Sequence, residues 1–149
     1  MNGRVLIVDD EPANVELLES MLAGHPDLEV MSVSDSRRAE RAFMDFEPDL
    51  VLLDLHMPEP DGLEILSRLR SARASLGFLP VIVMSADDSR LARNSALGLG
   101  ADEFLTKPFD HAEVLLRVRN LLHTRELYVE LANAKEALEQ RQRPRRQTS

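Results

Sequence analysis

Five polar residues of this chain have side chains suited to phosphoryl chemistry, and each stands at the end of a short, mostly apolar run: Asp9, Asp10, Asp54, Ser85 and Lys107. Three carboxylates held close together repel one another and raise each other's pKa values. A hard divalent cation with oxygen ligands, Mg²⁺ or Mn²⁺, relieves that repulsion. The lysine would supply a point charge for an anion, and the serine hydroxyl would supply a hydrogen bond. Around a lone carboxylate, this set predicts an aspartate that attacks phosphorus and becomes an acyl phosphate.

These side chains can act together only if the fold brings them to one place, and the runs that precede them indicate how. Five runs, the second of them partly polar, are predicted to be strands: Val5–Val8, Leu28–Val33, Leu50–Leu53, Val81–Met84 and Glu103–Thr106. Apolar strands separated by helices are typical of a parallel sheet covered on both faces. With right-handed crossovers, the commonest small arrangement is an α/β, flavodoxin-like, doubly wound sheet of strand order 2-1-3-4-5. Its site lies outside the carboxyl ends of the strands, where the polar residues would converge.

Helical patterns fill the segments between the strands, and the last one is unusually long. Four shorter stretches of helical spacing begin near Pro12, Ala39, Leu63 and residue 88. From Asp110, a residue type suited to an N-cap, the pattern runs without glycine or proline to Gln142. At about 1.5 Å per residue this helix would be about 50 Å long, so it must project from the body. We therefore expect a domain over residues 1–124 and a helical extension with a basic, disordered tail over 125–149.

The charge is distributed unevenly along the chain. The 149 residues hold 18 basic and 26 acidic side chains, a net charge of −8. The last nine residues carry four arginines and no acid, so residues 1–140 carry −12. An acidic body of this kind does not favour direct binding to nucleic acid. The chain has no cysteine, which excludes thiol chemistry, and no apolar run approaches a membrane span, so we expect a cytoplasmic protein without a membrane partner.

Four segments stand in order at the ends of the predicted strands, and together they form a specific pattern. They are Val5-Leu6-Ile7-Val8-Asp9-Asp10-Glu11, Leu52-Leu53-Asp54-Leu55-His56-Met57-Pro58 with Asp61-Gly62, Val81-Ile82-Val83-Met84-Ser85-Ala86, and Gly100-Ala101-Asp102-Glu103-Phe104-Leu105-Thr106-Lys107-Pro108-Phe109. Through them the sequence resembles a two-component response-regulator receiver domain over residues 3–124. The resemblance implies a switch that accepts a phosphoryl group from a sensor histidine kinase or a histidine phosphotransfer protein. It also implies a downstream protein target or output domain.

The resemblance assigns roles to the residues around the predicted acceptor. Asp54 would be the phosphoacceptor, and Lys107 would hold a phosphoryl oxygen. Asp10 would bind Mg²⁺ directly, and Asp9 would bind it mainly through water. Asp54 and the main-chain carbonyl of His56 would complete the protein ligands of the metal.

Further residues would couple this site to the rest of the domain. Ser85 would be the switch hydroxyl that moves toward the phosphoryl group, and Phe104 would be the aromatic residue that changes rotamer with it. The Lys107–Pro108 bond is cis in similar proteins. His56, two residues past the acceptor, and Asp87, two past the switch serine, depart from the commonest residues of the family. Because these positions line the path of the hydrolytic water in similar proteins, we hypothesise that they set the lifetime of the phosphorylated state.

The long C-terminal helix carries a thin seam whose spacing alternates three and four, as in a coiled coil. Its positions are Leu121, Thr124, Tyr128, Leu131, Lys135 and Leu138. Four of these six are apolar or aromatic, which leaves open both a homodimer through this helix and a solvated linker helix. Similar extensions join receivers to output domains in cyclic-di-GMP phosphodiesterases and hybrid kinases, so a receiver module cut from such an enzyme is an alternative.

Two other classes of protein share parts of this pattern. An aspartyl-nucleophile phosphatase or phosphotransferase usually has a second acid two residues after the nucleophile, where this chain has His56, and a cap or longer insertion. A flavin-binding module needs a phosphate loop rich in Ser, Thr and Gly after the first strand, where Asp9 and Asp10 would repel phosphate. We therefore expect a switch that acts catalytically on itself alone, and not an enzyme with a separate substrate.

Overall fold

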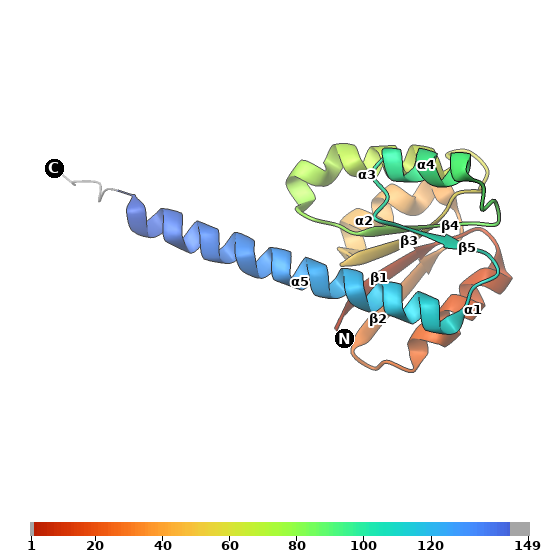
Figure 1. The fold of residues 1–149 in the computed structure, drawn as a ribbon, viewed down its shortest axis with the longest axis horizontal. Coiled ribbons are helices and arrows are strands. Elements are labelled where there is room, and N and C mark those ends of the chain that lie inside the picture. The colour runs from red at the N-terminus through yellow and green to blue at the C-terminus, as the bar shows by residue number, and fades with distance from the viewer. Residues whose placement is uncertain (1, 144–149) are drawn as a thin grey trace.

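A five-stranded parallel sheet forms the centre of the molecule (Figure 1). The computed structural model describes residues 2–143, without the side chains of residues 72–76. The strands are β1 (Gly3–Val8), β2 (Leu28–Val33), β3 (Leu50–Asp54), β4 (Val81–Ser85) and β5 (Glu103–Thr106). Their order is β2-β1-β3-β4-β5. The predicted fold class and strand order are therefore confirmed.

Helices cover both faces of this sheet. In the described part of the chain they are α1 (Pro12–Ala23), the 3₁₀ turn η1 (Ser36–Arg38), α2 (Ala39–Phe46), α3 (Gly62–Leu76), α4 (Arg90–Gly98) and α5 (His111–Gln142). Helices α1 and α5 cover one face, and α2, α3 and α4 cover the other (Figure 1). Side-chain oxygens of Asp61, Ser89 and Asp110 cap the starts of α3, α4 and α5, as expected for these residue types. Because Ser89 is the cap, α4 begins two residues later than predicted.

Two apolar clusters, one on each face, fix the central strand β3. Val51 and Leu53 join the cluster under α2, α3 and α4, while Leu50 and Leu52 join the cluster under α1 and α5. All four side chains are fully buried. Burial of one such side chain contributes about 1.5–3 kcal/mol. The position of Asp54, the last residue of β3, is therefore set by a strand that is held from both sides.

The last helix packs on the body for its first turns and then continues into solvent (Figure 1). Val114, Val118 and Leu122 are buried against the sheet, whereas every residue from 126 to 143 is exposed. The helix has 32 residues, which corresponds to about 48 Å at about 1.5 Å per residue. The predicted projection is confirmed. Despite this length, neither α5 nor any other helix in the described residues has the apolar character needed to cross a membrane.

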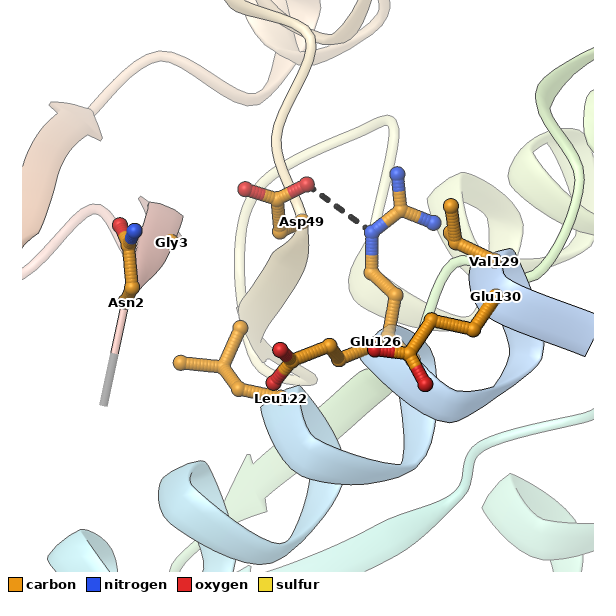
Figure 2. Close-up of a pocket in the computed structure, with 8 residues that line it drawn as sticks. Asn2, Gly3, Asp49, Leu122, Glu126, Val129 and Glu130 are labelled. Atoms are coloured by element: carbon orange, nitrogen blue, oxygen red, sulfur yellow. Dashed lines mark hydrogen bonds and ion pairs between the residues drawn. The ribbon is translucent and has the colours of Figure 1, made fainter. Parts of the chain in front are cut away.

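A set of contacts holds α5 where it leaves the body, at the amino edge of the sheet. Arg125 Nε donates to Asp49 Oδ1 at 2.9 Å, and Asp49 Oδ2 accepts the backbone N–H of Arg4 at 2.8 Å. Arg125 Nη1 also donates to the carbonyl of Phe78, whose ring lies 5.5 Å from the ring of Tyr128, centroid to centroid. Figure 2 shows the ion pair of Asp49 beside an open pocket. We call Asp49, Phe78, Arg125 and Tyr128 the exit clamp.

Candidate functional site

Three aspartates meet at the carboxyl edge of the sheet. Asp9 and Asp10 follow β1, and Asp54 ends β3. Each offers a carboxylate oxygen, and these oxygens lie within 4.8 Å of one another. Asp9 is fully buried and Asp54 is 2% exposed. The structure thus brings together the carboxylates that the sequence analysis placed at this edge.

Asp54 has one anchored oxygen and one open oxygen. Its Oδ1 accepts the N–H of His56 at 3.1 Å and lies 3.2 Å from Lys107 Nζ. Within the described residues, no hydrogen bond or ion pair reaches its Oδ2. Lys107 Nζ also lies 3.5 Å from Asp9 Oδ2. The ammonium group of Lys107 is therefore shared between two buried carboxylates, and the site carries an excess of negative charge.

Burial raises the pKa of Asp54 to about 6, above its ordinary value of 3.8. The N–H of His56 and the ammonium group of Lys107 lower this pKa, and the carboxylate of Asp9 raises it. Burial outweighs the two favourable contacts, so Asp54 is harder to ionise than an exposed aspartate. A further cation among the carboxylates would favour the ionised form.

The donors at this edge fit a hard divalent cation. Asp9, Asp10 and Asp54 offer oxygen ligands only, and Mg²⁺ prefers carboxylate oxygens together with several water molecules. Asp9 Oδ1 already accepts the N–H of Glu11 at 2.9 Å, and its Oδ2 faces Lys107. Both oxygens of Asp9 thus have partners, and its contact with a metal through water stays a prediction. The role of the His56 carbonyl stays a prediction.

Hydrogen bonds hold Ser85, which is fully buried at the end of β4. Its Oγ lies 2.8 Å from His56 Nε2 and accepts the N–H of Asp87 at 3.0 Å. The carboxylate of Asp87 accepts the N–H of Ser89 at 2.9 Å, and hydrogen bonds from Ser89 lower the pKa of Asp87. Both residues proposed to tune the site therefore contact Ser85, His56 through its ring and Asp87 through its backbone.

Phe104 lies on the same side of the sheet as Ser85. It pairs with Val83 across β4 and β5, and residues two apart on a strand share a face. The ring of Phe104 is buried in the cluster under α4. The guanidinium carbon of Arg93 on α4 lies 4.9 Å from the ring centroid, a cation–π arrangement. Both residues of the predicted switch pair thus lie on the face of the sheet that α2, α3 and α4 cover, and Phe104 contacts α4.

Two features of the site were not predicted from the sequence. Gly62 starts α3 so close to β3 that a Cβ there would collide with the carbonyl oxygen of Asp54. The pair Asp61-Gly62 is part of the pattern that carries the family resemblance, but the sequence does not show its close approach to Asp54. Arg93 gave no signal, because arginines are common on exposed helix faces. The expected cis bond between Lys107 and Pro108 is present.

The chain is similar to known proteins over most of its length. Residues 5–119 match the family model described as response regulator receiver domain. The alkaline phosphatase synthesis transcriptional regulatory protein PhoP of Bacillus subtilis is 35% identical over 127 residues, which are 85% of this chain and 51% of PhoP. The response regulator PleD of Caulobacter vibrioides is 38% identical over 121 residues, which are 81% of this chain and 26% of PleD.

A solved structure shares the fold. The receiver domain of the Francisella response regulator 1452 superposes with a TM-score of 0.75 at 28% identity, covering 83% of this chain and 98% of that chain. The chain spans about half the length of PhoP and a smaller share of PleD. The two curated relatives are thus longer proteins, and this chain matches one part of each.

Proposed function

The chain belongs to the receiver-domain family of two-component response regulators, which are phosphorylation-activated switches, and we propose that Asp54 is the residue that accepts its phosphoryl group. The donor would be the phosphohistidine of a sensor histidine kinase or of a histidine phosphotransfer protein. Lys107 and Ser85 would assist the transfer, and Phe104 would change rotamer in response and so alter the surface of the domain.

The observation that carries this proposal is the open oxygen of Asp54. Because Oδ1 is held by the N–H of His56 and by Lys107, Oδ2 is the oxygen left to react. In the transfer, Oδ2 forms a bond to phosphorus while the bond from phosphorus to the imidazole nitrogen of the donor breaks, and that nitrogen keeps the electron pair. In the return step, water attacks phosphorus, the bond to Oδ2 breaks, and inorganic phosphate leaves.

The charged groups around Asp54 suit this chemistry. When bound by Asp9, Asp10, Asp54 and the carbonyl of His56, Mg²⁺ or Mn²⁺ would supply positive charge against the phosphoryl oxygens. Lys107 Nζ, 3.2 Å from Asp54 Oδ1, lies where it can bond to one of those oxygens. Lys107 is in place before the reaction, and a bound metal ion would be too, so both would stabilise the developing charge without a large rearrangement.

We further infer that His56 holds the switch serine in its resting position. The hydroxyl of Ser85 lies 2.8 Å from the His56 ring, so a phosphoryl oxygen on Asp54 must compete with that ring for the same hydroxyl. When Ser85 turns toward the phosphoryl group, Phe104 on the same face can follow. The surface formed by α4 and β5 then changes, which biases a two-state element.

A downstream protein, or a further segment of a longer protein, would respond to this change. PhoP is named a transcriptional regulator, so an output that binds DNA is one candidate. The acidic body of the chain itself gives no reason for direct contact with nucleic acid. We propose that the only reactions of the chain are the phosphorylation of its own Asp54 and the hydrolysis of that acyl phosphate. We also propose that it works in the cytoplasm.

The test is incubation with acetyl phosphate and Mg²⁺, followed by mass spectrometry of the intact chain. The parent chain should gain the mass of one phosphoryl group, and Asp54→Asn should gain none. The matched control is Asp49→Asn, at the other end of β3, which should be labelled like the parent. An unlabelled parent would refute the proposal, and equal labelling of parent and Asp54→Asn would assign the acceptor to another residue.

A further inference from the structure

The projecting part of α5 carries a stripe of exposed leucines. Leu127, Leu131 and Leu138 are 52%, 69% and 55% exposed. Together with Ala134 they are spaced four, three and four residues apart, the repeat of a coiled-coil seam. At about 100° per residue, these four positions fall within a band of roughly 60° on the helix surface. Large apolar side chains gathered on one side of a projecting helix are typical of an interaction surface.

The exit clamp sets the direction in which this leucine stripe faces. Leu122 is buried in the body, and Arg125 bonds to Asp49, so that side of the helix is turned toward the sheet. The leucine stripe lies roughly opposite on the helix wheel. It therefore faces away from the body from its first residue, and no part of the body that the structure describes covers it.

This geometry changes the seam that spacing alone predicts. Leu121 packs against the cluster under α1 and α5, and the ring of Tyr128 packs against Phe78. Both positions of the predicted seam are thus turned toward the body. The exposed repeat is Leu127, Leu131, Ala134 and Leu138, and Lys135 moves from the centre of the seam to its flank.

The charges beside the leucine stripe indicate both the partner and its direction. With the leucines at positions a and d of a heptad, Glu130 occupies a g position and Lys135 the following e position. In a parallel pair, g of one helix lies beside the next e of the other, which would give two Glu130–Lys135 ion pairs. In an antiparallel pair, g faces g and e faces e, so Glu130 would face Ala137 and Lys135 would face Tyr128. Self-complementary charges favour a second copy of this chain in parallel orientation.

We propose that the leucine stripe of α5 binds the same stripe of a second chain as a parallel, two-stranded coiled coil. The stripe faces away from each body, so the two domains lie on opposite sides of the joined helices. The seam is shorter than two heptads, and we therefore expect a reversible dimer that depends on concentration. This interaction does not require phosphorylation of Asp54, and it stands or falls separately from the proposed phosphoacceptor.

The test exchanges the two flanking charges and measures association by sedimentation equilibrium of the full chain. Glu130→Lys and Lys135→Glu should each weaken the dimer roughly tenfold, because both ion pairs become repulsive. An equimolar mixture of the two variants should recover the parental association, and so should the double variant E130K/K135E. Glu136→Lys, at a position that points away from the seam, makes the same charge change and should have no effect.

A second variant tests the seam itself. Leu131→Asp should leave the chain monomeric, with the circular-dichroism helix content and acetyl phosphate labelling of the parent. A parent chain that stays monomeric at all concentrations would overturn the proposal. A dimer that is lost in Leu131→Asp but unchanged in Glu130→Lys would overturn the parallel orientation. The same association constant in Asp54→Asn would show that the dimer is independent of the phosphoacceptor.

Discussion

Two aspartates flank strand β3, and each pairs with a cation, but their surroundings differ. Asp49, just before the strand, has a partner for each carboxylate oxygen: Arg125 for Oδ1 and the N–H of Arg4 for Oδ2. Asp54, at the end of the strand, has partners on Oδ1 alone within the described residues. Asp49 is partly exposed, whereas Asp54 is buried and shares its lysine with Asp9.

The difference separates a group that stabilises the fold from a group that is available for chemistry. Burying a charge without enough partners costs stability, and such costs concentrate where function requires an open position. At the amino edge each carboxylate oxygen of Asp49 has a partner, and the bond to Arg125 fixes helix α5 against the body. At the carboxyl edge one oxygen of Asp54 has no partner among the described residues, as its proposed role as acceptor requires.

The sharpest test of this comparison replaces each aspartate by asparagine and measures unfolding in urea at about pH 7 with a chelator present. Asp49→Asn should lower the free energy of unfolding by about 1.5–3 kcal/mol, the usual worth of hydrogen bonds to charged groups. Asp54→Asn should raise it by up to about 3 kcal/mol, since the pKa of Asp54 is about 6 against an ordinary 3.8 and each unit corresponds to about 1.36 kcal/mol. Changes of the same sign would contradict the comparison.

The pH dependence of the free energy of unfolding should also show the raised pKa of Asp54. Between about pH 4 and pH 6 the folded chain holds a proton on Asp54 that the unfolded chain has lost. Without divalent cations, the free energy of unfolding of the parent, relative to Asp54→Asn, should therefore fall by about 3 kcal/mol as the pH rises through this window. The two chains should be equally stable below about pH 4. A constant difference across the window would show that burial does not raise the pKa.

Mg²⁺ should offset the stability that the chain loses by burying the ionised carboxylate of Asp54. At a concentration about 100 times its dissociation constant, a ligand that binds only the folded state adds about 2.7 kcal/mol. The parent and Asp49→Asn should both gain this stability in thermal unfolding, and a variant that lacks a metal-ligating carboxylate, Asp10→Asn, should gain much less. Equal gains in the parent and Asp10→Asn would place the metal elsewhere.

The smallest effect is expected at His56. Removing its ring in His56→Ala frees the Ser85 hydroxyl from a bond worth about 0.5–1.5 kcal/mol, so labelling by acetyl phosphate should quicken by roughly two- to tenfold. His56→Gln, which can still reach a hydroxyl, should remain closer to the parent. Decay of the phosphorylated chain should change in His56→Ala and in Asp87→Ala. If both variants decay at the parental rate, neither residue sets the lifetime.

The sequence predicted the carboxyl edge more fully than the amino edge. Each strand that contributes to the site ends where apolar residues give way to a polar one, so Asp54, Ser85 and Lys107 could be placed from local pattern. The exit clamp joins Asp49 to Arg125, 76 residues apart. Nothing local marks such a pair. Helical spacing fixes which residues share a side of α5, but only this contact fixes which side meets the body. The predicted seam therefore included Leu121 and Tyr128, which the structure places against the body.

The contact between His56 and Ser85 shows a further limit. The family resemblance marked both positions, but it assigned His56 to the path of water. The distance of 2.8 Å between the ring and the hydroxyl depends on how the turn after β3 folds over the end of β4. His56 in this turn and Ser85 at the end of β4 are 29 residues apart, and nothing in the sequence shows that they share a hydrogen bond.

The length of α5 beyond the exit clamp makes the helix a lever. From Arg125 to Gln142 the helix extends about 26 Å at about 1.5 Å per residue. A tilt of about 10° about the clamp as fulcrum displaces its far end by roughly 4–5 Å. The clamp grips the carbonyl of Phe78, in the loop that leads into β4, the strand that ends in Ser85. A small movement of that loop would therefore displace the far end of α5 by a larger distance, well outside the domain.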